Sequence, residues 1–163
     1  MSSLDRRSLI LAPLALAACG FTPAYAPGGA ATRLTGTVRA ADPADRNAFD
    51  FVERIEERLG RPQRHLYDLT YTIATETVGV GVATDNQITR YNLKGAIDFA
   101  LVDAATGATV ASGRVQSFTA FAATGSTVAG LAAEEDAGLR LMRLLADQIV
   151  TRLIASSGEW GGT

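Results

Sequence analysis

The sequence predicts an α+β domain in which two helices pack on one face of a four-stranded, mostly antiparallel sheet, in the element order β-α-β-β-β-α. Two segments place apolar residues three or four positions apart, as on one side of a helix. Other segments alternate apolar and polar residues, as in strands with one buried face. Because the helix stripes and one sheet face must all be buried, the simplest arrangement packs both helices on that face. The other sheet face is then polar and open to a partner.

The first strand and the first helix are predicted before residue 62. Apolar and polar residues alternate over residues 34–39, which indicates a short strand. Asp45 supplies an N-cap for the helix, and Gly60 ends the helix just before Pro62. The predicted buried side of this helix consists of Phe49, Val52, Ile55 and Leu59.

Three strands are predicted in the middle of the chain, at residues 66–76, 91–101 and about 109–121. Each is rich in residues that favour strands and has one apolar face. Residues 103–107, Asp-Ala-Ala-Thr-Gly, form the turn between the last two strands. The alternation in the last strand breaks near Gly113, so we expect a β-bulge there.

The last helix is predicted to begin near Glu134, where acidic residues complement the helix dipole. Residues 156–163 are polar and rich in glycine, so we expect a disordered tail. The predicted buried side of the helix consists of Leu141, Leu145, Ile149 and Leu153, widened by Met142, Ala146 and Val150.

The composition restricts the classes of function. The chain has 163 residues and a formal net charge of −2. That charge provides no basic field for nucleic acid, so we expect no nucleic-acid partner. A lone cysteine cannot form an intramolecular disulfide, and a lone histidine cannot build a histidine-rich metal site.

Residues 1–18 have the three parts of a secretory signal: a positive start, an apolar run and small residues at the end. The apolar run is far shorter than the roughly 20 residues that span a bilayer. It ends in Leu-Ala-Ala-Cys, which resembles the lipobox of bacterial lipoproteins. We therefore expect cleavage before Cys19 and acylation of its sulfur, with palmitate among the attached lipids; the export route stays open between Sec and twin-arginine transport.

The mature chain is then predicted to have three parts. Residues 19–31 carry the lipid and form a flexible tether rich in proline and glycine. Residues 32–155 form the folded domain, and residues 156–163 form the tail. Several acyl chains together anchor a protein stably, whereas a single chain binds a membrane only marginally.

Catalytic constellations are not found in the sequence. His65 stands alone, without an acid and a nucleophile that could be assigned to it. The glycines at 79 and 81 follow a strand but precede another strand, so they do not form a phosphate-binding loop. The acidic residues of the first helix are interpreted as a solvated face. We therefore expect no enzyme activity, no metal and no cofactor other than the lipid on Cys19.

Several stretches resemble the lipopolysaccharide-assembly lipoproteins, the LptE family, in their alphaproteobacterial form. They cover most of the mature chain in the expected order and spacing. They are residues 16–25 around Cys19, Thr89-Arg90-Tyr91-Asn92-Leu93, the turn at residues 103–107, residues 133–137 and residues 145–153.

This resemblance implies a fold of two helices on a four-stranded sheet, and it implies a role. Such a lipoprotein sits at the periplasmic face of the outer membrane and plugs a β-barrel partner of the LptD type. It assists the assembly of that barrel and the delivery of lipopolysaccharide to the outer leaflet. A different interpretation, a lipid-anchored accessory subunit of an ABC-type lipid-transport system, also fits a lipid-anchored domain without catalytic residues.

Candidate lipopolysaccharide-binding residues come from the charge pattern. Lipopolysaccharide carries phosphate and carboxylate groups, which clustered Lys or Arg side chains bind. Arg90 and Lys94 are four positions apart on one strand and so share a face, and Arg114 on the next strand could join them. The alternative interpretation of these three residues is a solubilising face of the sheet.

Overall fold

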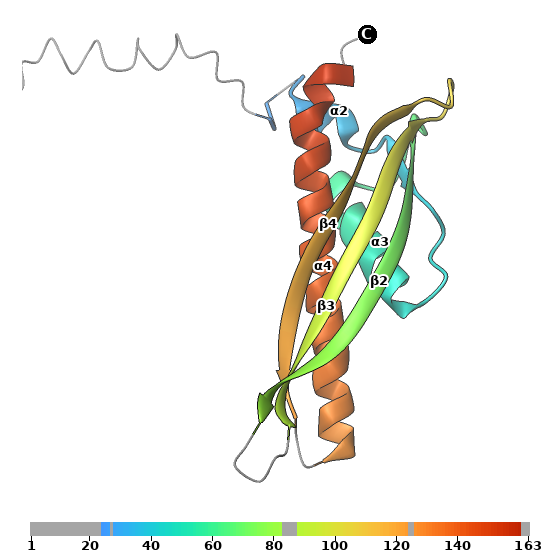
Figure 1. The fold of residues 1–163 in the computed structure, drawn as a ribbon. Helices are drawn as coiled ribbons and strands as arrows, with labels where there is room; N and C mark the ends of the chain where they lie inside the picture. Colours follow the sequence, from blue (N-terminus) through green and yellow to red (C-terminus); the bar gives the residue numbers. More distant parts are fainter. Residues whose placement is uncertain (1–23, 27, 83–87, 124–125, 161–163) are drawn as a thin grey trace, which may run out of the picture.

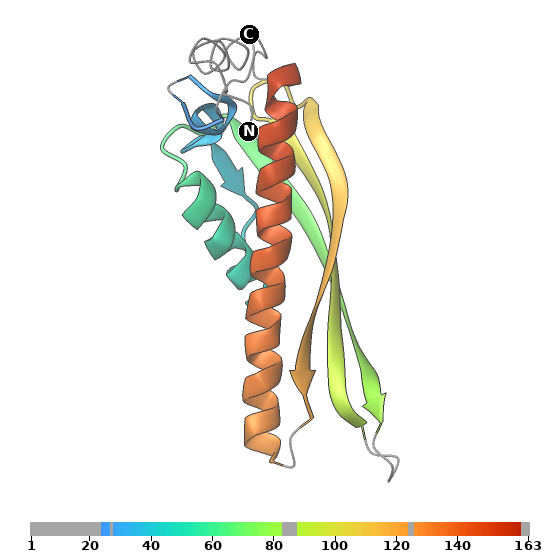
Figure 2. The same ribbon diagram turned by 90° about the vertical axis from the view of Figure 1, so that its left-hand side faces the viewer.

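The computed structural model describes residues 24–26, 28–82, 88–123 and 126–160, and it confirms the α+β class. Its four strands form a sheet in the order β1-β2-β3-β4, in which β1 is parallel to β2 and the other neighbours are antiparallel. Figures 1 and 2 show both longer helices on one side of this sheet. The elements are α2 (Ala30–Leu34), β1 (Val38–Ala40), α3 (Arg46–Leu59), β2 (Tyr67–Val82), β3 (Ile88–Asp103), β4 (Thr109–Ala122) and α4 (Thr127–Trp160).

The longest element is α4, whose 34 residues extend along the full length of the sheet (Figure 2). At about 1.5 Å per residue it is roughly 50 Å long. Its predicted apolar stripe is confirmed, because each of these side chains is 0% exposed: Leu141, Met142, Leu145, Ala146, Ile149, Val150 and Leu153.

Both predicted ends of this helix were wrong. The helix begins at Thr127 instead of near Glu134, because its first turns expose Val128 and Leu131 and so lack the buried periodicity that marks a helix in the sequence. Residues 156–160, predicted as the start of a disordered tail, continue the helix. Tertiary contacts hold them there: Ser157 is buried, and the ring of Trp160 lies edge-on to Tyr67 at 5.3 Å.

The boundaries of α3 were predicted correctly, but one of its buried residues was not. The side chain of Asp45 accepts a hydrogen bond of 2.8 Å from the amide of Ala48, and Gly60 follows the last turn. Phe51 is fully buried and its ring lies 4.7 Å from that of Tyr71, whereas Phe49 is 58% exposed. Both phenylalanines fit a spacing of three or four to the rest of the stripe, so the position of the sheet decides which one is buried.

The segment before α3 also differs from the prediction. Residues 34–39 were expected to form a strand, but Leu34 ends the short helix α2 and only Val38–Ala40 pair with β2. Gly36 lies between them with φ of +68°, a conformation that glycine adopts without strain. Ala31, expected at the end of the tether, belongs to α2 and is 1% exposed.

The strand register places the irregularities of the sheet elsewhere than predicted. Gly113 is opposite Phe99 in regular pairing, so the bulge expected there is absent. The glycine instead makes room for the Phe99 ring, since a Cβ at Gly113 would lie 3.4 Å from it. The register shift in the pairing of β3 with β4 lies at Leu101 and Val102 of β3, next to the turn.

α4 packs tightly against the sheet at Gly95 in the middle of β3. A Cβ built there would lie 2.9 Å from Cδ2 of Leu141 and 3.0 Å from Cδ1 of Leu145. Both leucines are fully buried and have little room to move. The missing side chain at Gly95 therefore makes room for Leu141 and Leu145 against the sheet.

Asp147 joins the two longer helices. It accepts hydrogen bonds from Arg54 at 3.1 and 3.0 Å and from Arg58 at 3.2 Å. Arg54 also donates to Glu57 at 2.9 Å. The carboxylate of Asp147 and, to a smaller extent, that of Glu57 raise the pKa of Arg54 above its usual range.

We predict that Gly95→Ala lowers the free energy of unfolding by about 1–3 kcal/mol, because the added methyl group overpacks the contact with α4. The control is Gly138→Ala on α4, where the nearest heavy atom to the new Cβ would be Oδ1 of Asn47 at 3.7 Å. This control should raise stability by up to about 1 kcal/mol, since alanine favours helix over glycine. Urea denaturation followed by circular dichroism measures both, and equal effects of the two variants would contradict the packing argument.

We also predict that Asp147→Asn lowers the free energy of unfolding by about 1–2 kcal/mol, because both arginines of α3 lose a charged acceptor. Asp136→Asn is the matched control. It removes an exposed ion pair of 2.9 Å with Arg140 within α4, which should cost under about 0.5 kcal/mol. A double-mutant cycle of Asp147→Asn with Arg54→Gln in the same assay tests the coupling directly; strict additivity would exclude it.

Candidate functional site on the outer face of the sheet

The molecule is elongated and has two different ends. At one end, here called the α2 end, lie α2 and the last turn of α4 (Figure 1). At the other, the tip end, lie the end of β2, the beginning of β3 and the beginning of α4. Cys19 and residues 1–18 lie outside the described residues, and the chain enters the described fold at the α2 end.

The sheet face that points away from the helices is here called the outer face. None of the described helices covers it (Figure 2). Its side chains are mostly small or polar, which leaves a broad and nearly flat surface. They are Thr70, Thr72, Ala74 and Glu76 on β2, Asn92, Lys94, Ala96, Asp98 and Ala100 on β3, and Ser112, Arg114, Gln116 and Phe118 on β4.

The strand register decides where the predicted cations lie. Lys94 and Arg114 both line an open hollow of about 610 Å³ on the outer face. Arg90 is opposite Ala122, nearer the tip end, and does not line this hollow. The structure therefore brings two of the three predicted residues together.

Each of these two cations is opposite a carboxylate on a neighbouring strand. Nζ of Lys94 lies 4.0 Å from Oε2 of Glu76, and Nη1 of Arg114 donates to Oδ2 of Asp98 at 3.2 Å. All four side chains are more than half exposed, so water and salt screen both pairs. A bound anion would have to compete with Glu76 and Asp98. The outer face is consequently close to neutral around its hollow.

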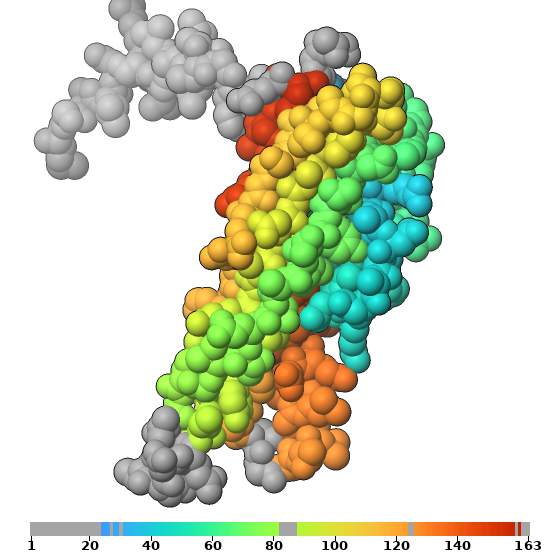
Figure 3. Space-filling model, turned by 45° about the vertical axis from the view of Figure 1, so that its right-hand side comes forward, coloured from blue at the N-terminus to red at the C-terminus, as the bar shows by residue number. Residues whose placement is uncertain are grey.

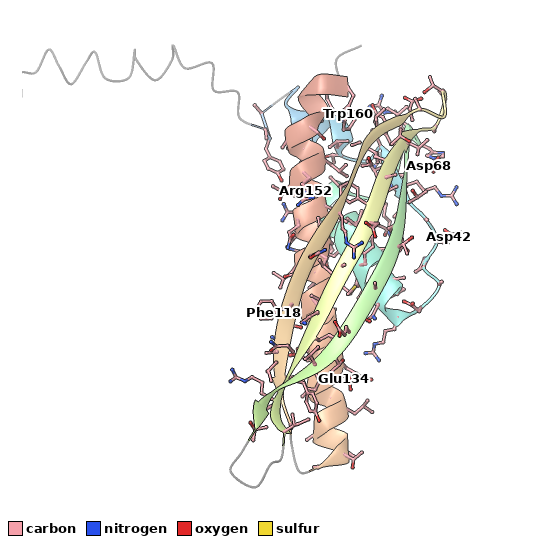
Figure 4. The ribbon with its side chains drawn as sticks, in the orientation of Figure 1. Asp42, Asp68, Phe118, Glu134, Arg152 and Trp160 are labelled. Atoms are coloured by element: carbon pink, nitrogen blue, oxygen red, sulfur yellow. The ribbon has the colours of Figure 1, made fainter. Side chains whose placement is uncertain are left out.

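Phe118 is a member of this face to which the sequence analysis assigned no role. It is opposite Lys94 and is 62% exposed. In Figure 4 its ring projects away from the sheet. An aromatic residue among the polar positions of a strand is the signal that could have identified it, because such residues are enriched where proteins meet partners.

The described residues offer little for catalysis or metal binding. Nε2 of His65 lies 2.7 Å from Oδ1 of Asp68, at the exposed start of β2. In the described part of the chain, no three His, Cys, Asp or Glu residues come close enough to hold a metal ion. None of the described helices combines the length and the apolar character that crossing a membrane requires.

Sequence comparison identifies one family. A family model for lipopolysaccharide assembly, LptE, matches residues 31–153. No curated protein matches the chain significantly by sequence.

Several solved structures share the fold. A putative lipoprotein from Caulobacter crescentus CB15 has a TM-score of 0.61 at 24% identity, covering 77% of this chain and 90% of its own. Lipoprotein B from Nitrosomonas europaea has a TM-score of 0.60 at 15% identity, with coverages of 86% and 94%. Rare lipoprotein B from Shewanella oneidensis has a TM-score of 0.55 at 13% identity, with coverages of 75% and 94%. At these identities the similarity shows a common fold.

Proposed function

The chain belongs to the LptE family of lipopolysaccharide-assembly proteins, and from this premise we propose that it is an outer-membrane lipoprotein that plugs the lipopolysaccharide-transport β-barrel. In this proposal the acylated Cys19 holds the domain at the periplasmic face. The domain assists folding of an LptD-type barrel and the delivery of lipopolysaccharide to the outer leaflet. This role is structural and requires no catalytic residue or cofactor. The family match over residues 31–153 carries the proposal.

The surface chemistry of the domain supports a position inside a barrel. The lumen of an outer-membrane barrel is polar, so a plug needs a polar surface. The outer face meets this requirement with small and polar side chains, and the charges around its hollow occur as opposed pairs. Such a surface can approach a polar wall without burying an unpaired charge.

The length of the domain supports an axial orientation. The apolar band of such a barrel is only about 25 Å tall. An α4 of roughly 50 Å would extend beyond it. If the tip end enters the barrel, the α2 end stays on the periplasmic side, where the chain continues toward Cys19.

Lipopolysaccharide binding is the finer part of the proposal, with Lys94 and Arg114 as its cations and Phe118 as an apolar neighbour. Phosphate groups would displace Glu76 and Asp98 from these cations. Arg90, nearer the tip end, is a further cation on the same strand as Lys94.

We predict that the double variant Glu76→Gln, Asp98→Asn binds lipopolysaccharide about fivefold more tightly, because it frees both cations. Lys94→Gln with Arg114→Gln should weaken binding by a similar factor. Two exposed charges at about 0.5 kcal/mol each give this magnitude. Affinity is measured by fluorescence anisotropy with labelled lipopolysaccharide at fixed salt.

The control for this prediction is Glu53→Gln with Asp136→Asn, which changes the net charge equally but on the exposed sides of α3 and α4. This control should leave the affinity within about twofold of the unmodified protein. An equal gain in both double variants would show an effect of net charge and would contradict a site on the outer face.

We predict that photoreactive side chains at Gln116 and at Arg143 both crosslink to the same outer-membrane barrel in intact cells. Gln116 is on the outer face and Arg143 on the exposed side of α4, so a barrel that surrounds the domain contacts both. Adducts from one position only would contradict a plug. Adducts with an inner-membrane ATPase complex would instead support an accessory subunit of an ABC-type lipid-transport system.

A further inference from the structure

The two edges of the sheet are treated differently. On β4, the outward-pointing carbonyl groups accept hydrogen bonds from long side chains of α4. Arg152 donates to the carbonyl of Arg114 at 2.6 Å, Gln148 to that of Gln116 at 3.5 Å, and Arg140 to that of Ala120 at 3.4 Å. Four residues of helix and two residues of strand advance by similar distances, about 6 Å, so one helix can follow the edge. These side chains obstruct the addition of another strand to β4.

Beyond its first residues, the edge of β2 has no such cover from the part of the chain that the structure describes. β1 pairs only with Tyr67–Leu69. The amide of Tyr67 donates to Thr37 at 3.1 Å and the carbonyl of Leu69 accepts from Ala41 at 2.9 Å, so odd-numbered residues point their backbone groups to this side. By the same alternation, the amides and carbonyls of Ile73, Thr75 and Thr77 point outward, where the described residues place no strand.

We call residues Ile73–Gly79 the open edge. Exposed edges are usually protected by proline, lysine or bulges. The open edge contains neither proline nor lysine, and its one charged residue, Glu76, lies on the outer face. Four of its residues favour strands: Ile73, Thr75, Thr77 and Val78. The register shifts at Gly79 and Gly81 come only at its tip-end boundary. This stretch is therefore a ready template for an added strand.

A hollow lies on the helix side of the open edge. It has a volume of about 340 Å³ and is bounded by the sheet, by the first turns of α3 and by α4. Thr75, Thr77, Leu93 and Leu131 are among its lining residues. Figure 3 shows β2 and the beginning of α4 side by side, with α3 covering only the part nearer the α2 end. Inward side chains of an added strand would enter this hollow.

The hollow has an excess of negative charge. Arg46 is the only cation among the described residues that line it, and Arg46 is paired with Glu135 at 3.0 Å. Asp50 and Glu134 also line it, and no described cation forms an ion pair with either (Figure 4 labels Glu134). A basic side chain is the complement of this hollow.

We propose that the open edge is a strand-addition site. It accepts an extended segment of a partner protein as a further strand, and an Arg or Lys of that segment enters the hollow beside Asp50 and Glu134. Backbone hydrogen bonds hold the segment, and the basic residue selects it.

Charge complementarity selects a partner protein over this chain itself. A second copy would present its own β2, which has no Lys or Arg and would bring a second Glu76. Residues 19–30 also lack a basic residue and contain two prolines. Neither segment supplies the cation that the hollow lacks.

The test uses the full-length lipidated protein in detergent and a fluorescein-labelled nine-residue peptide of alternating threonine and valine with a central arginine. We expect saturable binding by fluorescence anisotropy. Replacing the arginine of the peptide by glutamate should weaken binding at least tenfold. N-methylation of one alternate set of peptide amides should abolish binding, and methylation of the other set should not, because only one set faces β2.

Protein variants locate the site. Thr75→Pro removes an outward amide that β3 does not use, so it should abolish peptide binding while the melting temperature changes little. Thr75→Val keeps the amide and should bind normally. Asp50→Asn with Glu134→Gln should weaken binding about tenfold, whereas Glu53→Gln with Asp136→Asn, of equal net charge, should not.

Amide exchange measured by NMR provides an independent readout. The amides of Ile73, Thr75 and Thr77 should become protected when the arginine peptide binds. No binding of this peptide, equal binding of both methylated peptides, or normal binding by Thr75→Pro would each overturn the proposal. So would a dimer of the free protein in which these same amides are already protected.

Discussion

The packing of α4 along one face of the sheet is the constraint on which the rest of the structure depends. Gly95 lets the helix approach β3 at the middle of the sheet, and Leu141 and Leu145 fill the contact. Asp147 then fixes α3 beside α4 through Arg54 and Arg58. All of this apolar cover lies on one side. The opposite side carries small and polar residues, and none of the helices in the described part of the chain packs on it. One-sided burial thus leaves the outer face polar and without helical cover among the described residues.

Periodicity was enough to predict this division of faces. The buried stripe of α4 was predicted correctly from the sequence, because residues that are buried along one side of a helix recur every three or four positions. What periodicity could not decide was which of two equivalent positions is buried, as with Phe49 and Phe51, or where an element ends when its last turns are exposed. The first turns of α4 have no buried side, and its last turn depends on the contact of Trp160 with Tyr67.

The candidate site shows the same limit. Arg90 and Lys94 are an even number of positions apart, which places them on one face of the sheet. Their neighbours on the adjacent strands depend on the strand register, which cannot be read from one strand alone. Only the pairing of three strands brings Glu76 to Lys94 and Asp98 to Arg114, and leaves Arg90 nearer the tip. The near-neutral character of the outer face is therefore a property of the assembled sheet.

The unequal edges of the sheet follow from the unequal lengths of the helices. α4 is about as long as β4 and can supply hydrogen-bond donors along it. α3 has only 14 residues and covers only part of the length of β2. The hollow lies at the first turns of α3, and the open edge continues beyond them toward the tip end. A chain tethered at its α2 end would therefore present a single strand template at a distance from its anchor. In this fold the shorter α3 leaves part of β2 uncovered, and that is the direction in which the proposed strand would extend the sheet.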